Sequence, residues 1–527
     1  MRPLVAALCL IPGALAAQVP ALEGTFRIYQ AKSEIGREWF SWSDTLVRQS
    51  VVIPLINLNV ESANRRDPSG RFTGFTLSLH NAAGDTLLGG YKATSRGDSV
   101  DIASDLPKAP PGRVRPGAFD LVMPPQSVAS LAWLVTRAAG KDTTWRLLMA
   151  GADTILPAPV TFSGDTARIR LGAIEIIVHD SAGRVSWLEI PAQKARAVFT
   201  PAGQNLPALT GMARPRPDYS APAGANYTAR DVRVPVTPAV GDTFSLGCTL
   251  TEPKAGKRPF PAAITITGSG LQSRDEELWP LVPGYRPFRQ VAERLATIGY
   301  ATLRCDDRGK DESGGDPKIA TTVDLANDTK AQVAWLRTQT GINAARILLV
   351  GHSEGGMIGP MVAAEDPRIQ GVVVMAGPAK VGSLVLKDQA RWQVLTDTSL
   401  SADARARALV SADSSVTADS AAAGAWFQWF YHYDPLPTAR KVKQPVLILQ
   451  GALDRQVSAG QADSLGRAIR SGGNRRVTVK VFPGLNHLFL VAPKDGSPSE
   501  YTEIKDAALP ASVLDTLADW LVRTFKP

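Results

Sequence analysis

A serine stands at the centre of a G-x-S-x-G pattern, Gly-His-Ser-Glu-Gly, at residues 351–355. The apolar run Arg346–Val350 precedes the pattern, and the small residues of Gly356–Gly359, which can open a helix, follow it. Between a strand and a helix, the flanking glycines allow a turn tight enough to lift the serine hydroxyl above a sheet. We therefore predict that Ser353 is a nucleophile. The alternative interpretation is an ordinary glycine-rich turn.

A serine nucleophile needs a base within hydrogen-bonding reach and a carboxylate that orients this base. His487 follows the predicted strand Val477–Val481, and Asp454 follows the predicted strand Val446–Leu449. Each lies just past the carboxyl end of its strand, the same edge of the sheet that carries Ser353. We predict that His487 is the base and that Asp454 orients it.

The other histidines and one other acid are weaker candidates. His80 and His179 fall in strand-like runs, and His352 is expected to pack beneath the turn that carries the serine. His432 lies among aromatic residues, where a histidine is more often part of a core or a pocket wall. Asp434 lies beside it and is the weaker candidate acid.

Negative charge develops on a substrate carbonyl oxygen during nucleophilic attack, so main-chain N–H donors must be fixed in advance. The residue after the nucleophile, Glu354, supplies one N–H group. The second is expected from the loop at residues 266–271, with Ser269 as the first choice and Gly270 as the second. An ordinary turn is the alternative for this loop.

The pattern of the chain changes near residue 215. Residues 17–200 alternate apolar and polar residues between Gly/Asp turns, as in Phe75–Leu79, which predicts a β-rich antiparallel domain with one helix near Gln126–Ala139. Residues 201–229 are rich in Pro, Gly and Ala, which predicts an extended linker. From residue 230 to 527, short apolar runs alternate with helical segments, which predicts a mostly parallel sheet of about eight strands. The predicted strands are Val232–Val236, Thr243–Leu250, Ala262–Thr267, Ala301–Cys305, Ile347–Val350, Val372–Met375, Val446–Leu449 and Val477–Val481.

About seventy residues separate the strands at Val372–Met375 and Val446–Leu449, which is more than one crossover helix requires. We expect a helical cap insertion at about residues 380–440, placed over Ser353. Its aromatic residues would either line an apolar pocket or attach the cap to the sheet. These aromatic residues are Trp392, Trp426, Phe427, Trp429, Phe430, Tyr431 and Tyr433.

Residues 231–527 resemble the α/β-hydrolases, in particular the bacterial esterase and serine-aminopeptidase-like branch. The matching motifs are Gly268-Ser269-Gly270 with Arg274-Asp275, Asp306-Asp307-Arg308-Gly309, Gly351–Gly356, Gly451 with Asp454, and Asn486-His487. The chain order Ser…Asp…His is also that of this fold. The resemblance implies a Ser-Asp-His hydrolase that needs no metal or cofactor. The family often continues D-R-G-x-G-x-S, whereas Asp311 replaces the second glycine here. We recognise no family in residues 18–200.

The amino terminus has the layout of a secretory signal peptide over residues 1–16. Arg2 precedes the apolar run Leu4–Leu15, and small residues flank Leu15 as at a cleavage site. The run is too short to span a bilayer, and no other run is long enough to cross one. We expect an exported protein, periplasmic or secreted, without an integral membrane segment in its mature chain. A buried amino-terminal helix is the alternative.

Composition argues against several classes of protein. The formal net charge of +9 is small for 527 residues, and no Lys/Arg cluster is interleaved with aromatic residues, so we expect no nucleic-acid partner. No CxxC motif or Cys/His cluster indicates a metal site. Outside the predicted signal peptide, Cys248 and Cys305 can form at most one disulfide, provided that their strands are neighbours.

These features predict an exported serine hydrolase that cleaves small carboxylic esters through an acyl-enzyme intermediate. One alternative is a serine peptidase or aminopeptidase acting on short peptides, for which Glu354 and Glu276 are candidate anchors of the substrate amine. A prolyl-oligopeptidase arrangement is excluded, because a seven-bladed propeller needs roughly 280 residues and the amino-terminal region offers only about 180 without repeats. A non-catalytic binding protein that keeps a hydrolase fold is the third possibility.

Overall fold

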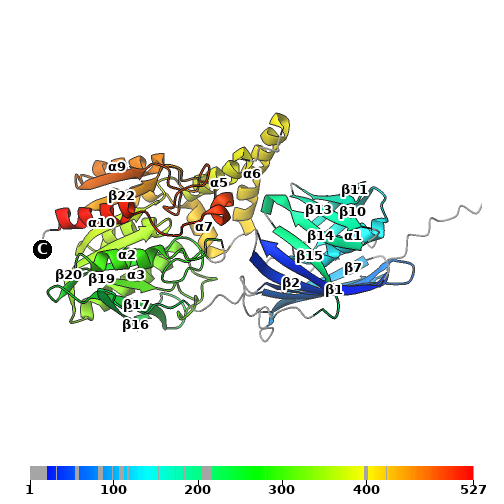
Figure 1. Cartoon of the computed structure of the whole chain (residues 1–527), viewed down its shortest axis with the longest axis horizontal. Coiled ribbons are helices and arrows are strands. Elements are labelled where there is room, and N and C mark those ends of the chain that lie inside the picture. The colour runs from blue at the N-terminus through cyan, green and yellow to red at the C-terminus, as the bar shows by residue number, and fades with distance from the viewer. Residues whose placement is uncertain are drawn as a thin grey trace, which may run out of the picture. The chain divides into compact units, whose positions relative to one another are not determined.

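The computed structural model divides into two compact units, Met1–Arg216 and Pro217–Pro527 (Figure 1). The boundary falls within the predicted linker. The predicted signal peptide lies outside the described residues. The structure describes residues 21–525 except for 31–32, 54–57, 81–86, 98, 106–111, 115–117, 152–153, 173, 182–183, 194, 205–216, 279–280, 397–400 and 423.

Within the residues that the structure describes, the N-terminal unit is built on one sheet of fifteen strands, in which all neighbouring strands are antiparallel except β9 and β10. Its residues alternate between buried and exposed along the strands, as in β3, because one face covers an apolar core and the other meets solvent. The buried helix α1 (Ala129–Ala138) packs into that core and lies within the predicted helical segment. The strands are β1 (Leu22–Gln30), β2 (Ser33–Trp42), β3 (Leu46–Ile53), β4 (Leu58–Arg66), β5 (Phe72–His80), β6 (Leu87–Arg96), β7 (Ser99–Ser104), β8 (Gly112–Val114), β9 (Leu121–Met123), β10 (Thr143–Met149), β11 (Thr154–Ser163), β12 (Thr166–Leu171), β13 (Ile174–Ser181), β14 (Arg184–Ile190) and β15 (Ala195–Pro201).

Glu38 on β2 holds the amino terminus of α1. Its carboxylate accepts hydrogen bonds from the Ser127 hydroxyl at 3.0 Å and from the N–H groups of Val128 and Ala129 at 2.7 and 2.8 Å. The side chain is 0% exposed. Burial raises the pKa of Glu38 from 4.5 to about 7, although the three donors oppose the shift.

We expect the N-terminal unit to lose stability as the pH rises from 4.5 through about 7, because the folded state holds the Glu38 proton more tightly than the unfolded state does. A shift of this size corresponds to about 3 kcal/mol in the free energy of unfolding. Urea unfolding of the wild type and of Glu38→Gln at pH 5 and pH 8 measures the difference. The variant Glu61→Gln, on the exposed face of β4, should keep the wild-type dependence. An equal pH dependence in wild type and Glu38→Gln would contradict this assignment.

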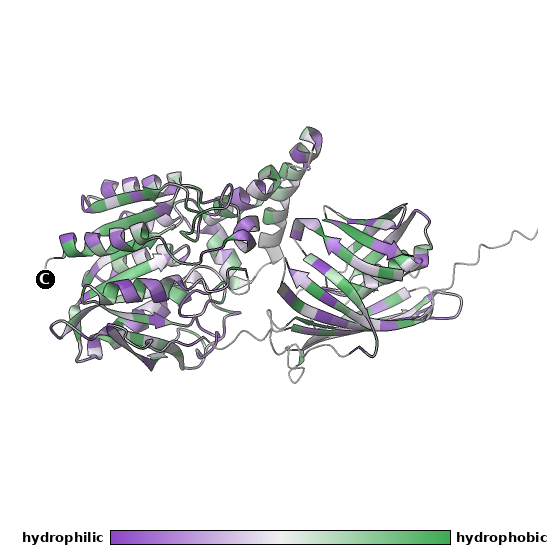
Figure 2. Ribbon diagram, viewed as in Figure 1, coloured by the Kyte–Doolittle hydropathy of each residue, from purple (hydrophilic) through white to green (hydrophobic). Residues whose placement is uncertain are grey.

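The C-terminal unit is an eight-stranded sheet in the order β16-β17-β19-β18-β20-β21-β22-β23. Only β17 runs against its neighbours, and all the other pairs are parallel. The central strands are hydrophobic along their whole length because both faces are covered, as Figure 2 shows. The strands are β16 (Tyr227–Val236), β17 (Phe244–Pro253), β18 (Phe260–Ile266), β19 (Ala301–Cys305), β20 (Ile342–His352), β21 (Ile369–Met375), β22 (Val446–Gly451) and β23 (Val477–Phe482).

Two separate cores lie on the two faces of this sheet. Alternate residues of β20 belong to different cores, Ile347 and Leu349 to one and Leu348 and Val350 to the other. Helices α3 (Thr322–Thr338), α4 (Gly355–Glu365) and α9 (Gly460–Ser471) pack on the first face. Helices α2 (Pro287–Ala296) and α10 (Ala511–Thr524) pack on the second. The fold class predicted from the sequence is thereby confirmed.

The predicted linker ends earlier than expected. Its last residues, 227–229, already belong to β16, where Tyr227 pairs with Pro253 of β17. The pattern of these residues resembles a linker because β16 is an edge strand, and most of its side chains remain at least partly exposed.

Four helices lie between β21 and β22, in the region predicted as a cap insertion (Figure 1). They are α5 (Gly382–Thr396), α6 (Ala402–Ala422), α7 (Ala425–His432) and α8 (Pro435–Ala439). The start of α5 lies against the end of α7, since a Cβ atom at Gly382 would come within 1.8 Å of the Phe430 carbonyl oxygen. The cap is therefore packed on itself by a close approach that only glycine permits.

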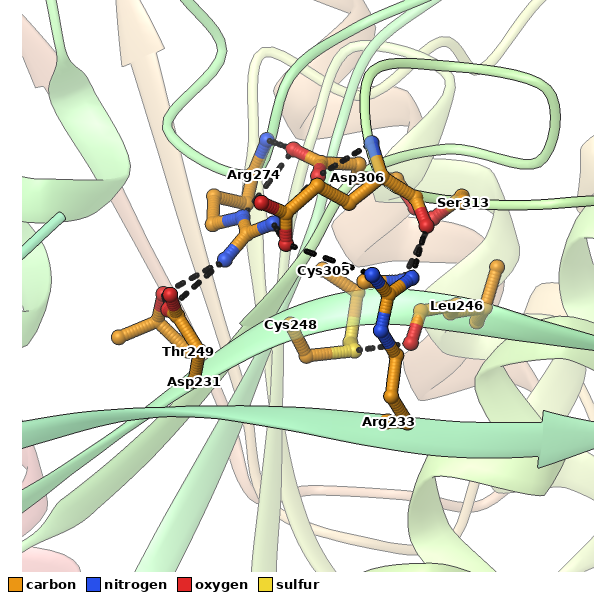
Figure 3. Close-up of a disulfide and its surroundings, with 11 residues drawn as sticks. Asp231, Arg233, Leu246, Cys248, Thr249, Arg274, Cys305, Asp306 and Ser313 are labelled. Atoms are coloured by element: carbon orange, nitrogen blue, oxygen red, sulfur yellow. Dashed lines mark hydrogen bonds and ion pairs between the residues drawn. A yellow bond between two sulfur atoms is a disulfide. The ribbon is translucent and has the colours of Figure 1, made fainter. Parts of the chain in front are cut away.

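The two cysteines whose pairing the sequence could not decide form a disulfide between neighbouring strands, β17 and β19. Cys248 and Cys305 are directly opposite each other in the antiparallel register (Figure 3). Beside them, Arg274 forms a fully buried ion pair with Asp306, whose Oδ2 lies 2.6 Å from the guanidinium Nη2. The pair ties the loop after β18 to the end of β19.

The position at which the family's second glycine is replaced keeps a left-handed backbone. Asp311 has a φ of +43°. Aspartate tolerates this region better than most residues because its short polar side chain can bond locally. The substitution noted in the sequence therefore preserves a backbone conformation that glycine favours.

Candidate active site

Ser353 lies at a sharp turn between β20 and α4. Its φ of +53° is unusual for a residue with a side chain, as expected of a nucleophile elbow. The flanking glycines are required by space, because a Cβ atom at Gly351 would lie 1.9 Å from the Gly355 carbonyl oxygen. At Gly355 it would lie 2.1 Å from the Ile266 carbonyl oxygen. The turn thus explains both glycines of the G-x-S-x-G pattern.

Asp454 and His487 follow β22 and β23, and the structure brings them together. His487 Nδ1 lies 2.8 Å from Asp454 Oδ2, and both side chains are buried. Asp454 Oδ1 accepts the N–H groups of Gln456 and Val457 at 2.9 and 2.8 Å. Oδ2 also accepts from the Gln450 amide at 2.7 Å. A carboxylate held by four donors orients the imidazole so that Nδ1 carries hydrogen and Nε2 is available as a base.

The loop that carries His487 lies against the serine turn. His352, the residue before Ser353, contacts the main-chain carbonyl of His487 through its Nε2 at 2.9 Å. The two imidazole rings are 4.8 Å apart between centroids. Asn486 holds the loop by accepting the N–H groups of Leu488 and Leu490. The predicted base is therefore anchored next to the predicted nucleophile.

The loop after β18 passes over Ser353. A Cβ atom at Gly268 would lie 3.1 Å from the Cβ atom of Ser353, so the backbone of this loop is close to the serine. Ser269, the predicted donor, comes next in the chain and is exposed, as is Gly270. Asp307 at the end of β19 holds the loop by accepting the Thr267 hydroxyl at 2.6 Å and an N–H group two residues after Gly270 at 2.8 Å. This arrangement suits a main-chain donor of an oxyanion hole.

Glu354, whose N–H group is the other predicted donor, turns its side chain inward. Its Oε1 accepts the Thr322 hydroxyl at 2.6 Å and the indole N–H of Trp426 at 2.8 Å. The carboxyl is 1% exposed, and burial raises its pKa while these hydrogen bonds lower it. Trp426 also stacks on Phe430 at 5.0 Å. One aromatic residue of the cap is thus bonded directly to the residue that follows the nucleophile.

Replacing Trp426 with phenylalanine is expected to reduce turnover about tenfold. The ring can still stack on Phe430, but the buried Oε1 of Glu354 loses one of its two donors and keeps only the Thr322 hydroxyl, a loss of about 0.5–1.5 kcal/mol. We expect turnover to fall because the serine turn and the cap are no longer held in their relative positions by this hydrogen bond. Steady-state kinetics on an ester substrate measures it. The control is Trp429→Phe, in the same helix as Trp426. It alters a ring that stacks on Tyr433 and should change turnover less than about threefold. Equal effects of the two variants would refute the specific role of Trp426.

The weaker candidates lie elsewhere. His80 and His179 belong to β5 and β13 of the N-terminal unit. His432 is exposed at the end of α7, and Asp434 caps α8 by accepting the Leu436 N–H at 3.0 Å. None of them contacts Asp454 or His487 in the described interactions.

Sequence reasoning missed the role of one acidic residue. Glu276, proposed only as an amine anchor, is buried and contacts His352. Its position two residues after the buried Arg274 carried no signal of such a contact. Among the described residues, no group of three or more His, Cys, Asp or Glu side chains is placed to hold a metal ion.

Comparison with known proteins agrees with this geometry. Residues 284–494 match the model of the family described as serine aminopeptidase, S33. Esterase EstD of Thermotoga maritima is 26% identical over 311 residues, which are 58% of this chain and 70% of the relative. The C-terminal unit has the α/β-hydrolase fold. The matches fall in the esterase and serine-aminopeptidase-like branch that the motifs predicted.

Two further similarities concern the same hydrolase unit. Dipeptidyl aminopeptidase BIII of Pseudoxanthomonas mexicana is 26% identical over 269 residues, which are 48% of this chain and only 35% of the relative. Among solved structures, an esterase of Pyrococcus furiosus is 19% identical with a TM-score of 0.40, and covers 58% of this chain and 94% of that chain. The curated relatives of this chain thus include an esterase and a peptidase.

Proposed function

We propose that the hydrolase unit cleaves carboxylic esters through Ser353, His487 and Asp454. The observation that carries the proposal is the buried Asp454–His487 pair, held 2.8 Å apart and anchored against the turn on which Ser353 has a φ of +53°. Such a pair suits the activation of a serine hydroxyl, and the turn presents that hydroxyl at the edge of the sheet.

In the proposed reaction, Ser353 Oγ attacks the ester carbonyl carbon while His487 Nε2 takes the hydroxyl proton. The N–H groups of Ser269 and Glu354 donate hydrogen bonds to the oxyanion that forms. The C–O bond to the alcohol then breaks, and the imidazolium of His487 gives its proton to the leaving oxygen. Water attacks the acyl-enzyme with His487 as the base, and the carboxylic acid is released as Ser353 regains its proton.

The inward orientation of two glutamate side chains favours esters over peptides as substrates. Glu276 and Glu354, the two candidate anchors for a substrate amine, are both buried and already accept hydrogen bonds from the protein. An alkoxide also leaves without obligatory protonation, so a general triad favours esters. A short-peptide aminopeptidase is the second candidate, supported by the similarity to a dipeptidyl aminopeptidase. A non-catalytic role is the third, and the buried hydrogen bond between Asp454 and His487 argues against it.

We propose further that the protein is exported, to the periplasm or beyond. Two observations support this: the signal-peptide pattern at residues 1–16, and the disulfide between Cys248 and Cys305, since disulfides persist mainly in oxidising compartments. Among the described residues, no helix has the length and apolar character needed to cross a membrane. Amino-terminal sequencing of the mature protein tests the proposal, with Ala17 expected as the first residue.

A side-by-side assay tests the chemistry. Purified protein is given p-nitrophenyl butyrate and alanine p-nitroanilide, with Ser353→Ala as the control. Ester turnover that disappears in the variant, with little anilide cleavage, supports the esterase. Anilide cleavage as fast as ester cleavage supports the aminopeptidase instead. Turnover of neither substrate, with Ser353 also unreactive toward a fluorophosphonate, overturns the catalytic proposal.

A further inference from the structure

His352 is buried beneath the serine turn with an oxygen atom at each of its ring nitrogens. Nδ1 lies 2.8 Å from Glu276 Oε1, and Nε2 lies 2.9 Å from the main-chain carbonyl oxygen of His487. The His352 side chain is 6% exposed and that of Glu276 is 5% exposed. The contacts join residues that are 76 and 135 positions apart in the chain.

The carboxylate of Glu276 extends this chain of hydrogen bonds to the loop after β18. The same Oε1 accepts the N–H group of Gly268 at 2.8 Å. One continuous path therefore runs from Gly268, beside the predicted oxyanion donor, through Glu276 and His352 to the carbonyl of His487. It connects three of the loops on which the proposed reaction depends: the loop after β18, the serine turn and the loop of His487.

The partners determine how many protons His352 carries. A carbonyl oxygen can only accept, so Nε2 must carry hydrogen to bond it. Glu276 Oε1 already accepts the N–H group of Gly268. It can accept a second hydrogen bond if Nδ1 of His352 also carries a hydrogen atom. Burial lowers the pKa of His352, but the charge and hydrogen bond of Glu276 and the carbonyl of His487 outweigh it and leave the pKa raised. A doubly protonated ring beside an ionised carboxylate gives both ring nitrogens of His352 and Oε1 of Glu276 hydrogen bonds in the right direction.

This arrangement also costs stability that a purely structural contact would not need. Glu276 holds a φ of +58°, a conformation that residues other than glycine seldom adopt. A buried ion pair is often no more stabilising than apolar side chains of the same volume, because both charges lose their hydration. The His352 ring lies 4.8 Å, between ring centroids, from the imidazole of His487, the proposed base.

We propose that Glu276 and protonated His352 form an ion pair that positions the three loops of the active site for the reaction of Ser353. Neither residue is catalytic, since both act through the groups that they hold. The inference rests on the proposed function only in that Ser353 is the nucleophile. It is independent of whether the substrate is an ester or a peptide.

The kinetic test uses Glu276→Gln, His352→Gln and the double variant in the full-length protein. Glutamine at position 276 supplies no charge to keep the ring doubly protonated, so one nitrogen of His352 would face an oxygen without hydrogen. We expect each single variant to lower kcat about 100-fold with KM nearly unchanged, because small misplacements of reacting groups have effects of this size. The double variant should lose no more than the worse single variant, because both break one path.

The matched control is Glu252→Gln. Glu252 is also a buried glutamate in an ion pair, 2.9 Å from Arg258, but it lies at the opposite edge of the same sheet. It should keep turnover within about twofold of the wild type. Labelling of Ser353 by a fluorophosphonate provides a second rate that needs no knowledge of the substrate. Wild-type labelling rates in Glu276→Gln would overturn the inference.

Nitrogen NMR of histidine-labelled protein reports the ion pair directly, and the chain holds only five histidines. We expect His352 to show two protonated ring nitrogens up to a higher pH in the wild type than in Glu276→Gln. A neutral ring in the wild type would refute the pair even if a variant fails to fold. If the wild type does not turn over esters but Glu276→Gln is labelled more slowly than the wild type, the ester proposal is rejected and this inference is kept.

Discussion

Ser353→Ala is expected to lower kcat about 10⁶-fold while leaving KM within a few-fold of the wild-type value. The hydroxyl oxygen is the atom that forms the bond to the acyl carbon, so without it only the oxyanion donors and substrate binding contribute to the rate. The backbone should not change, since alanine adopts the φ of +53° no less easily than serine does.

The measurement is turnover of p-nitrophenyl butyrate by enzyme purified free of wild type, together with the melting temperature. Ser464→Ala serves as the control, because it removes a half-buried hydroxyl of α9 that bonds only within its own helix, to the Gly460 carbonyl and to the Arg467 guanidinium. It should retain full activity. A folded Ser353→Ala protein with turnover within tenfold of the wild type would disprove the assignment of the nucleophile.

Asp454→Asn is expected to lower kcat about 10⁴-fold with little change in fold. The oxygen of the new amide is fixed by the main chain, since Gln456 and Val457 both donate N–H groups to Oδ1. The amide nitrogen must then take the place of Oδ2, where the carboxylate accepts from Gln450 and His487. The new amide N–H group would then face the N–H donors of Gln450 and His487.

The consequence falls on the tautomer of His487. An amide N–H pointing at Nδ1 favours the ring with its hydrogen on Nε2, the atom that must accept the serine proton. Turnover, the rate of labelling by a fluorophosphonate and the ring tautomer from nitrogen NMR measure this effect together. Loss of activity with an unchanged tautomer would contradict the explanation. Normal activity would contradict the role of Asp454.

Much of the hydrolase unit could be predicted because its strands carry their own signal. Each predicted strand from Val232–Val236 to Val477–Val481 overlaps one observed strand in the same order. Parallel strands covered on both faces must be apolar throughout, and a short apolar run between helical segments has few other interpretations. The fifteen-strand order of the N-terminal unit could not be derived, since alternation predicts strands without saying which ones pair.

The sequence by itself determined the features that depend on neighbouring residues. The serine turn is an example, because Gly351 and Gly355 are needed for a bend whose steric demands are set by a few consecutive residues. The predicted roles of Asp454 and His487 followed from their places after strands. Local geometry and chain order were sufficient for these assignments.

Only the tertiary structure decided which distant residues meet. Cys248 and Cys305 pair because β17 and β19 are neighbours in register. Glu276 and Glu354 turn inward, because His352 in one case and Trp426 in the other supply donors from remote segments. Whether a buried carboxylate binds a substrate or another loop depends on the packing of separate elements. No pattern of adjacent residues contains that information.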